Sequence, residues 1–171
     1  MYLSVLIVRL AKVALVAAIG AFALIVAHDN VVDYGSNYEF VRHVLSMDTT
    51  FPGNALMDRA ITDPRLWAAA YALIIAVEWL TGALATIGAL ILLARLRAPA
   101  VTFNNAKACA IAGLVFGFGL WFFGFLVVAG EYFLMWQSPT WNGQQAAFRI
   151  VAVILGALIF VALPDTDGAA S

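Results

Sequence analysis

Charge is scarce in this sequence. Charged residues make up 11% of the 171 residues and hydrophobic residues 64%, and the mean hydropathy is +0.96. Soluble domains are usually about a quarter charged, so the composition excludes an ordinary soluble domain and predicts a membrane protein. The net charge of -1 provides no basic surface for a nucleic acid, and none is expected as a partner.

Cysteine is also scarce, and the known catalytic motifs are missing. A single cysteine, Cys109, excludes an internal disulfide, a cysteine metal cluster and a CxxC redox pair. We find no nucleophile elbow, P-loop, HExxH or dinucleotide fingerprint. Four polar residues near one another in sequence do not reproduce a metal-ligand spacing and are interpreted as surface residues: His28, Asp29, Asp33 and His43. We therefore expect no enzyme activity, no metal and no cofactor.

Long apolar runs dominate what is present. Four runs reach the roughly 20 residues that a membrane-spanning helix needs, at about residues 3–27, 66–94, 108–136 and 146–163. The first could be a cleaved signal peptide, because Ala21-Phe22-Ala23 offers a cleavage site, but the run continues to Ala27 and favours an uncleaved helix. The predicted fold class is an all-α integral membrane protein, with one domain over residues 1–171 and four transmembrane helices in one bundle.

The charges outside these runs predict an orientation. Cations flank the span ends that four helices would place on one side: Arg9, Lys12, Arg95, Arg97 and Lys107. Acids follow on that side only at Asp165 and Asp167, whereas the opposite side carries six acids and three arginines. By the positive-inside rule both termini are cytoplasmic, and the loop 28–65 faces the periplasm.

The loop itself is predicted to be structured. Ser36 and Glu39 have the spacing of a capping box, and an apolar stripe follows at Phe40, Val41, Val44 and Leu45, which indicates a short amphipathic helix. Asp63 and Pro64 suit the N-cap and first position of the second span.

Two stretches carry a resemblance to a known family. They are SNYEFVRHVLSMDTTFPGN (36–54) and GEYFLMWQSPTWNGQQAAFR (130–149). Together with the four-span layout, they resemble the bacterial predicted small integral membrane proteins, domain of unknown function 2165. The resemblance covers nearly the whole chain. It implies a four-helix protein of the bacterial inner membrane and brings no activity or catalytic residues.

Three charged residues remain inside the predicted spans: Glu78, Glu131 and Arg149. Helical rise puts Glu78 near the midplane, Arg149 roughly 7 Å nearer the outer surface and Glu131 further out. Arg149 is then within reach of either carboxylate, and we predict a structural ion pair with Glu78. The alternative is a proton or ion relay, because two carboxylates that share one arginine leave one of them protonated.

Small residues share a helix face with each of these charges and predict that the charges point into helix contacts. The glycines concerned are Gly82 for Glu78, Gly113, Gly117 and Gly124 for Glu131, and Gly156 for Arg149.

The lack of catalytic residues beside a structured loop and an aromatic third span leads to two functional hypotheses. The first is a non-catalytic accessory subunit or assembly factor of a larger bacterial inner-membrane complex, with a respiratory complex as the first candidate. Its partners are the lipid bilayer and other inner-membrane subunits, contacted through Phe40, Val44, Trp136 and Trp141. The alternative is a small transporter, channel or quinone-binding protein that uses Glu78, Glu131 and Arg149, with a bound lipid or quinone.

Overall fold

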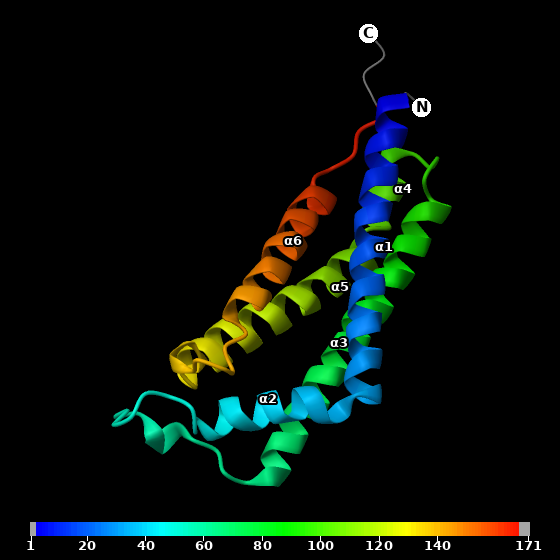
Figure 1. Cartoon of the computed structure of the whole chain (residues 1–171). Helices are drawn as coiled ribbons and strands as arrows, with labels where there is room; N and C mark the ends of the chain where they lie inside the picture. Colours follow the sequence, from blue (N-terminus) through cyan, green and yellow to red (C-terminus); the bar gives the residue numbers. More distant parts are fainter. Residues whose placement is uncertain (1–2, 168–171) are drawn as a thin grey trace.

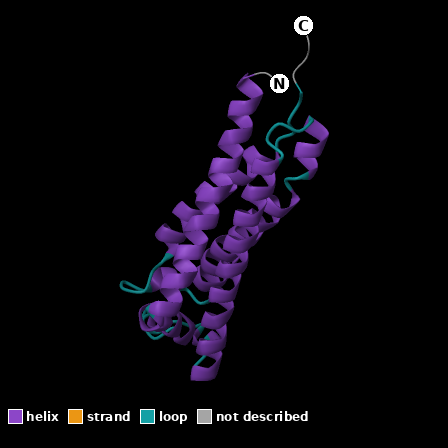
Figure 2. Cartoon of the chain, turned by 90° about the vertical axis from the view of Figure 1, so that its right-hand side faces the viewer, coloured by secondary structure: helices purple, strands orange, loops and turns teal. Residues whose placement is uncertain are grey.

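The computed structural model describes residues 3–167, and within that range it contains helices and no strand (Figure 2). Four helices are long and apolar enough to cross a membrane: Leu3–Val32, Pro64–Ala94, Ala100–Tyr132 and Gln144–Ala162. The first, second and fourth are α1, α3 and α6 (Figure 1). The four-helix membrane class is therefore confirmed, and α1 continues beyond its predicted end at residue 27.

The third span changes its winding along its length. It comprises α4 (Ala100–Asn105), α5 (Ala108–Phe118) and the π-helix η2 (Gly119–Tyr132), and a short 3₁₀ turn, η3 (Met135–Gln137), leads on to α6. At the end of η2 the backbone N–H of Phe133 donates to the carbonyl of Val128 at 3.0 Å, one residue further back than in an α-helix. A π-helix usually occupies a single turn, often at a functional site, so fourteen residues of it are unusual.

Glycines bring α3 close to α1 and α5. A Cβ atom added to Gly82 would lie 2.6 Å from Cγ of Leu24, and one added to Gly113 would lie 2.6 Å from the backbone nitrogen of Ala85. Gly117 is similarly tight, 2.9 Å from Cγ2 of Thr81 by the same measure. These distances are too short for any side chain, so the structure places three of the predicted glycines at helix contacts.

The remaining glycines divide differently from the prediction. Gly20 of α1 and Gly88 of α3 also lie against neighbouring helix backbones, although their sequence positions were not singled out. A Cβ atom added to Gly156 would have nothing within 4 Å. A Cβ atom added to Gly124 would meet only Cδ1 of Leu120, at 3.7 Å, and Leu120 belongs to the same helix. Neither Gly124 nor Gly156 therefore brings two helices together. The prediction failed for them because a small residue on a membrane helix can also lie away from helix contacts.

At the end away from Leu3 and Asp167, here called the loop end, the helices separate. Figure 1 shows η2 leaning away from α3 in company with α6, and α2 (Tyr34–Ser46) crossing the space between them. The predicted capping box is wrong. Helix α2 begins before Ser36, whose hydroxyl donates to the side chain of Asp33 at 2.7 Å.

The rest of the loop, including the short helix η1 (Met57–Arg59), docks onto the connection between η2 and α6. The backbone N–H of Phe51 donates to Oε1 of Gln137 at 3.0 Å. The loop is also closed on itself, because the backbone N–H of Ile61 donates to the carbonyl of Leu45 at 2.8 Å. These bonds hold α2 in place across the gap between α3 and η2.

The opposite end, here called the terminal end, is held by a buried ionic cluster. Lys12 of α1 and Lys107 before α5 both contact Oδ2 of Asp165, at 2.8 Å and 2.6 Å. Both ammonium groups also donate to the carbonyl of Leu163 at 2.7 Å. Burial raises the pKa of Asp165, but the hydrogen bonds from Lys107 and Lys12 outweigh it, so the pKa lies below its usual value.

Arg9 and Asn104 extend this cluster to the remaining segments. Arg9 is fully buried and donates to the carbonyls of Leu96 and Ala98 in the turn after α3. Its Nε also lies 3.6 Å from Asp165. Asn104 bonds the backbone of Asp165 in both directions, at 3.0 Å and 2.9 Å. The segment after α6 is thus fastened to the ends of the other three spans.

Replacing Asp165 by alanine is expected to lower the free energy of unfolding by about 3–5 kcal/mol, because two buried ammonium groups lose their counter-charge. Asp167→Ala is the matched control, since the Asp167 side chain is 66% exposed, lies 3.9 Å from Arg9 and accepts one hydrogen bond, from the backbone N–H of Ala100 at 2.8 Å, whose loss costs about 1 kcal/mol. Exposed pairs contribute about 0–1 kcal/mol. Melting temperature and membrane abundance measure the difference, and equal melting of the two variants would contradict the role of the cluster.

Candidate functional site

Glu78 lies at the centre of a small polar network. Its side chain is buried and accepts a hydrogen bond at Oε2 from the amide of Asn30 at 2.7 Å. The amide of Asn37 donates to Oδ1 of Asn30 at 2.6 Å, and the hydroxyl of Tyr71 donates to the backbone carbonyl of Asn30 at 3.1 Å. Asn30 therefore joins α1 to both α2 and α3.

The predicted ion pair between Glu78 and Arg149 is not formed. The hydrogen-bond partner of the Glu78 carboxyl group is the amide of Asn30 instead. Helix α6 turns a stripe of residues inward that includes Ala147 and Val151. Arg149 lies two residues from each of them, and residues two apart lie on opposite sides of a helix. Its side chain is exposed, and no salt bridge joins it to a carboxylate among residues 3–167.

Glu131 is also placed apart from Glu78. It is exposed on η2, where the side-chain amide of Gln144 donates to its Oε1 at 3.5 Å. The prediction counted α-helical spacing from Gly117 through Gly124 to Glu131. Because η2 is a π-helix, that spacing does not hold after Phe118, and Glu131 turns to a different face. The structure does not bring the three charges together.

Glu78 contacts the last turn of α1, at the loop end of that helix. Its partner Asn30 lies in the last turn of α1, which ends at Val32. The helical rise from Glu78 to Arg95 is roughly 26 Å, most of a hydrocarbon core of about 30 Å. Helix α3 continues past the end of α1 at the loop end (Figure 1), and the depth of Glu78 in the bilayer stays a prediction.

A cavity of about 220 Å³ opens onto this network. Asn30, Asn37, Tyr71 and Glu78 form its polar part. The other walls come from α1, α2, α3, η2 and α6 and include the buried Trp121. No lysine, arginine or histidine lines it. The cavity thus presents amides, a phenol and one carboxyl group without a cation.

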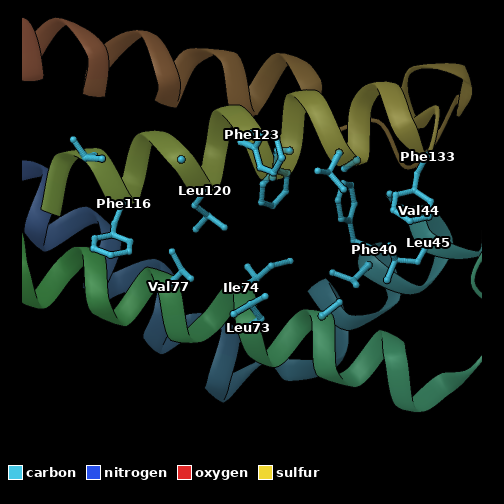
Figure 3. A pocket seen from close by; sticks show the side chains of 18 residues that line it. Phe40, Val44, Leu45, Leu73, Ile74, Val77, Phe116, Leu120, Phe123 and Phe133 are labelled. Atoms are coloured by element: carbon cyan, nitrogen blue, oxygen red, sulfur yellow. The ribbon is translucent and has the colours of Figure 1, made fainter. Parts of the chain in front are cut away.

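A second, larger cavity of about 620 Å³ follows the gap between α3 and η2, and we call it the groove (Figure 3). Every residue that lines it is apolar, and it extends from Val44 and Phe133 near α2 to Phe116 in α5 (Figure 3). The groove and the polar cavity share four lining residues, Phe40, Val41, Ile74 and Phe125. The two cavities therefore adjoin.

The residues predicted as partner contacts have different surroundings. Val44 is buried, and Phe40 lines both cavities, so these two face the interior. Trp141 stacks on the ring of His43 at 4.5 Å between centroids. Trp136 is 44% exposed, and its ring packs edge-to-face against Phe51 at 5.7 Å between centroids.

Asn30, Asn37 and Tyr71 are functional candidates that the sequence analysis missed. Asn30 follows the predicted end of the first span at residue 27, so it was assigned to the loop. The available signal was the unmatched Glu78, because a buried carboxyl group requires a hydrogen-bond donor from a neighbouring helix. Sequence spacing alone does not identify which donor that is.

Asn30→Leu is expected to lower the free energy of unfolding by about 1–3 kcal/mol, because it leaves a buried carboxyl group without a donor. Arg149→Leu, at an exposed site on α6, is expected to change it by less than about 0.5 kcal/mol. Thermal melting of both variants in the same detergent distinguishes this network from the ion pair. A large loss in Arg149→Leu with an unchanged Asn30→Leu would restore the ion pair.

Comparisons with known proteins give one match. A family model described as predicted small integral membrane protein (DUF2165) matches residues 8–164. No curated protein and no solved structure matches the chain.

Proposed function

The chain belongs to the family of predicted small integral membrane proteins (DUF2165), and we propose that it holds the apolar chain of a lipid-like molecule within the bilayer without catalysing a reaction. The groove between α3 and η2 carries this proposal. It has the volume of a small-molecule site, about 620 Å³, and a wholly apolar lining.

The shape of the groove favours an elongated ligand, here called the guest. Its walls run from α2 at the loop end to Val115 and Phe116 of α5, so the long axis follows the spans (Figure 3). An acyl or isoprenoid chain in the bilayer lies along the same direction. Apolar contact alone gives little preference over bulk lipid, because lipid tails are equally apolar. Retention therefore depends on close fit and on a polar anchor at one end.

Glycine helps to keep the groove open. Gly119 lines it and has nothing within 4 Å of the position where a Cβ would lie. Beyond it, Phe123 and Phe125 of η2 add two aromatic rings to the lining. The combination leaves room beside rigid rings, which suits a flexible chain.

We place the protein in a bacterial inner membrane with the terminal end in the cytoplasm. Arg95 and Arg97 remain exposed at that end and support this orientation by the positive-inside rule. Reporter fusions after Asn54 and after Trp141 are expected to be periplasmic, and a fusion after Pro99 cytoplasmic. Paired alkaline phosphatase and fluorescent-protein reporters measure this, and a cytoplasmic reporter at Asn54 would reverse the orientation.

Gly119→Leu tests the groove. The new side chain occupies the cavity, and overfilling a site typically costs about 1–3 kcal/mol, so retention of the bound lipid-like molecule is expected to fall roughly tenfold. The matched control is Gly156→Leu, because Gly156 is an exposed helical glycine with equally open surroundings that lies outside the groove. Both changes raise helix propensity alike.

The measurement is native mass spectrometry of protein purified in a mild detergent, followed by extraction and identification of the bound molecule. Parent and Gly156→Leu are expected to retain it, and Gly119→Leu to lose it. If the parent carries no small molecule, or if both variants carry it equally, the groove does not hold a lipid-like chain.

A second candidate is the accessory subunit of a larger inner-membrane complex, such as a respiratory complex. The exposure of Phe116 and Phe123, at 45% and 61%, favours it, because a transmembrane helix of another subunit could cover these rings. The same purification separates the two functions. A stoichiometric protein partner with an empty groove supports the accessory role.

A further inference from the structure

The polar cavity contains hydrogen-bonding groups that an apolar chain cannot use. It adjoins the groove through Phe40, Val41, Ile74 and Phe125, so a guest whose chain lies in the groove can bring its head group to Glu78. Rings of Phe40 and Phe125 stack with their centroids 6.3 Å apart in the shared wall. A ligand that occupies both cavities lies against these two rings, one from α2 and one from η2.

The hydrogen bonds at Glu78 leave one acceptor for a guest. The amide of Asn30 occupies Oε2, and no described residue donates to Oε1. Asn30 has in turn used its own Oδ1 to accept from Asn37. Glu78 lines the cavity, and in the ionised form of its carboxyl group Oε1 is an acceptor, which favours a ligand that donates a hydrogen bond.

The charge of the cavity excludes the common anionic head groups. Its lining contains the carboxyl group of Glu78 and no cationic side chain. Arg149, the nearest cation in sequence to the α6 part of the lining, is exposed instead. A phosphate would meet an acidic group with no counter-charge, and such a buried anion is costly.

We propose that the polar cavity binds a neutral hydroxyl head group, an alcohol or a phenol, whose O–H donates to Glu78 while the attached chain occupies the groove. This inference rests on the proposed function, because it assigns the head group of the same guest. The volume of about 220 Å³ is sufficient for a single ring, since an apolar cavity of about 150 Å³ already accepts benzene.

Three probes with the same chain test the head group: 4-decylphenol, its methyl ether 4-decylanisole, and decyl phosphate. Binding to the full chain in phosphatidylcholine nanodiscs is read from the dependence of the melting temperature on probe concentration. The phenol is expected to bind roughly tenfold more tightly than the ether, which has lost the donor. Decyl phosphate is expected to bind more weakly than both.

Glu78→Gln reverses the chemistry while it preserves the shape. The glutamine can still accept from Asn30 through its oxygen and then presents an N–H donor to the cavity. The methyl ether should gain affinity, and the advantage of the phenol should shrink to less than about threefold. Melting of the variant without probe confirms that it is folded. If it is not folded, the ratio of phenol to ether affinity in the parent decides by itself.

The outcomes separate this inference from the function on which it rests. If phenol and ether bind equally in the parent, or if Glu78→Gln leaves their ratio unchanged, the head-group assignment is overturned and the groove stands. If neither probe binds, or if Gly119→Leu binds both as the parent does, the proposed function fails as well. Decan-1-ol distinguishes the two sources, because an alcohol site accepts it and a phenol site does not.

Discussion

The close approach of α3 to α1 and α5 is the constraint on which the rest of the structure depends. Gly82 and Gly113 allow it, because no side chain fits between the backbones there. The glycine contacts end at Gly117, and the next residues of the third span wind as the π-helix η2. Beyond this point no comparable contact holds η2 to α3, so the two diverge. The groove is the consequence, and α2 closes it at the loop end.

Much of the fold could be predicted from local signals. The four spans follow from the length of their apolar runs, and Asp63 caps α3 as its sequence suggests, by accepting a hydrogen bond from the backbone N–H of Arg65 at 2.9 Å. The π winding of η2 could not be predicted, because the same apolar residues suit an α-helix. The start of α2 was also misplaced, because Ser36 turns to Asp33 instead of capping the helix.

The candidate site was predictable only in part. The isolated Glu78 correctly indicated a buried polar group that needs a partner. Its partner was misassigned because the sequence does not give the relative rotation of the helices. The prediction therefore chose Arg149 for its charge over the neutral amide of Asn30. Glu131 was misplaced for a different reason, since counting by α-helical spacing fails along η2. A neutral amide near a span end carries little hydropathic signal, and only the folded arrangement identifies it.

The cluster around Asp165 also has a consequence for biosynthesis. Arg9 and Lys12 emerge with the first span, whereas Asp165 follows all four spans in the chain. During insertion these cations are without that carboxylate, and in the orientation proposed above this favours their retention on the cytoplasmic side. Once the last span is in place, Asp165 forms ion pairs with Lys12 and Lys107, and these side chains become part of the interior. One set of residues thus serves first as a topology signal and later as the closure of the completed bundle.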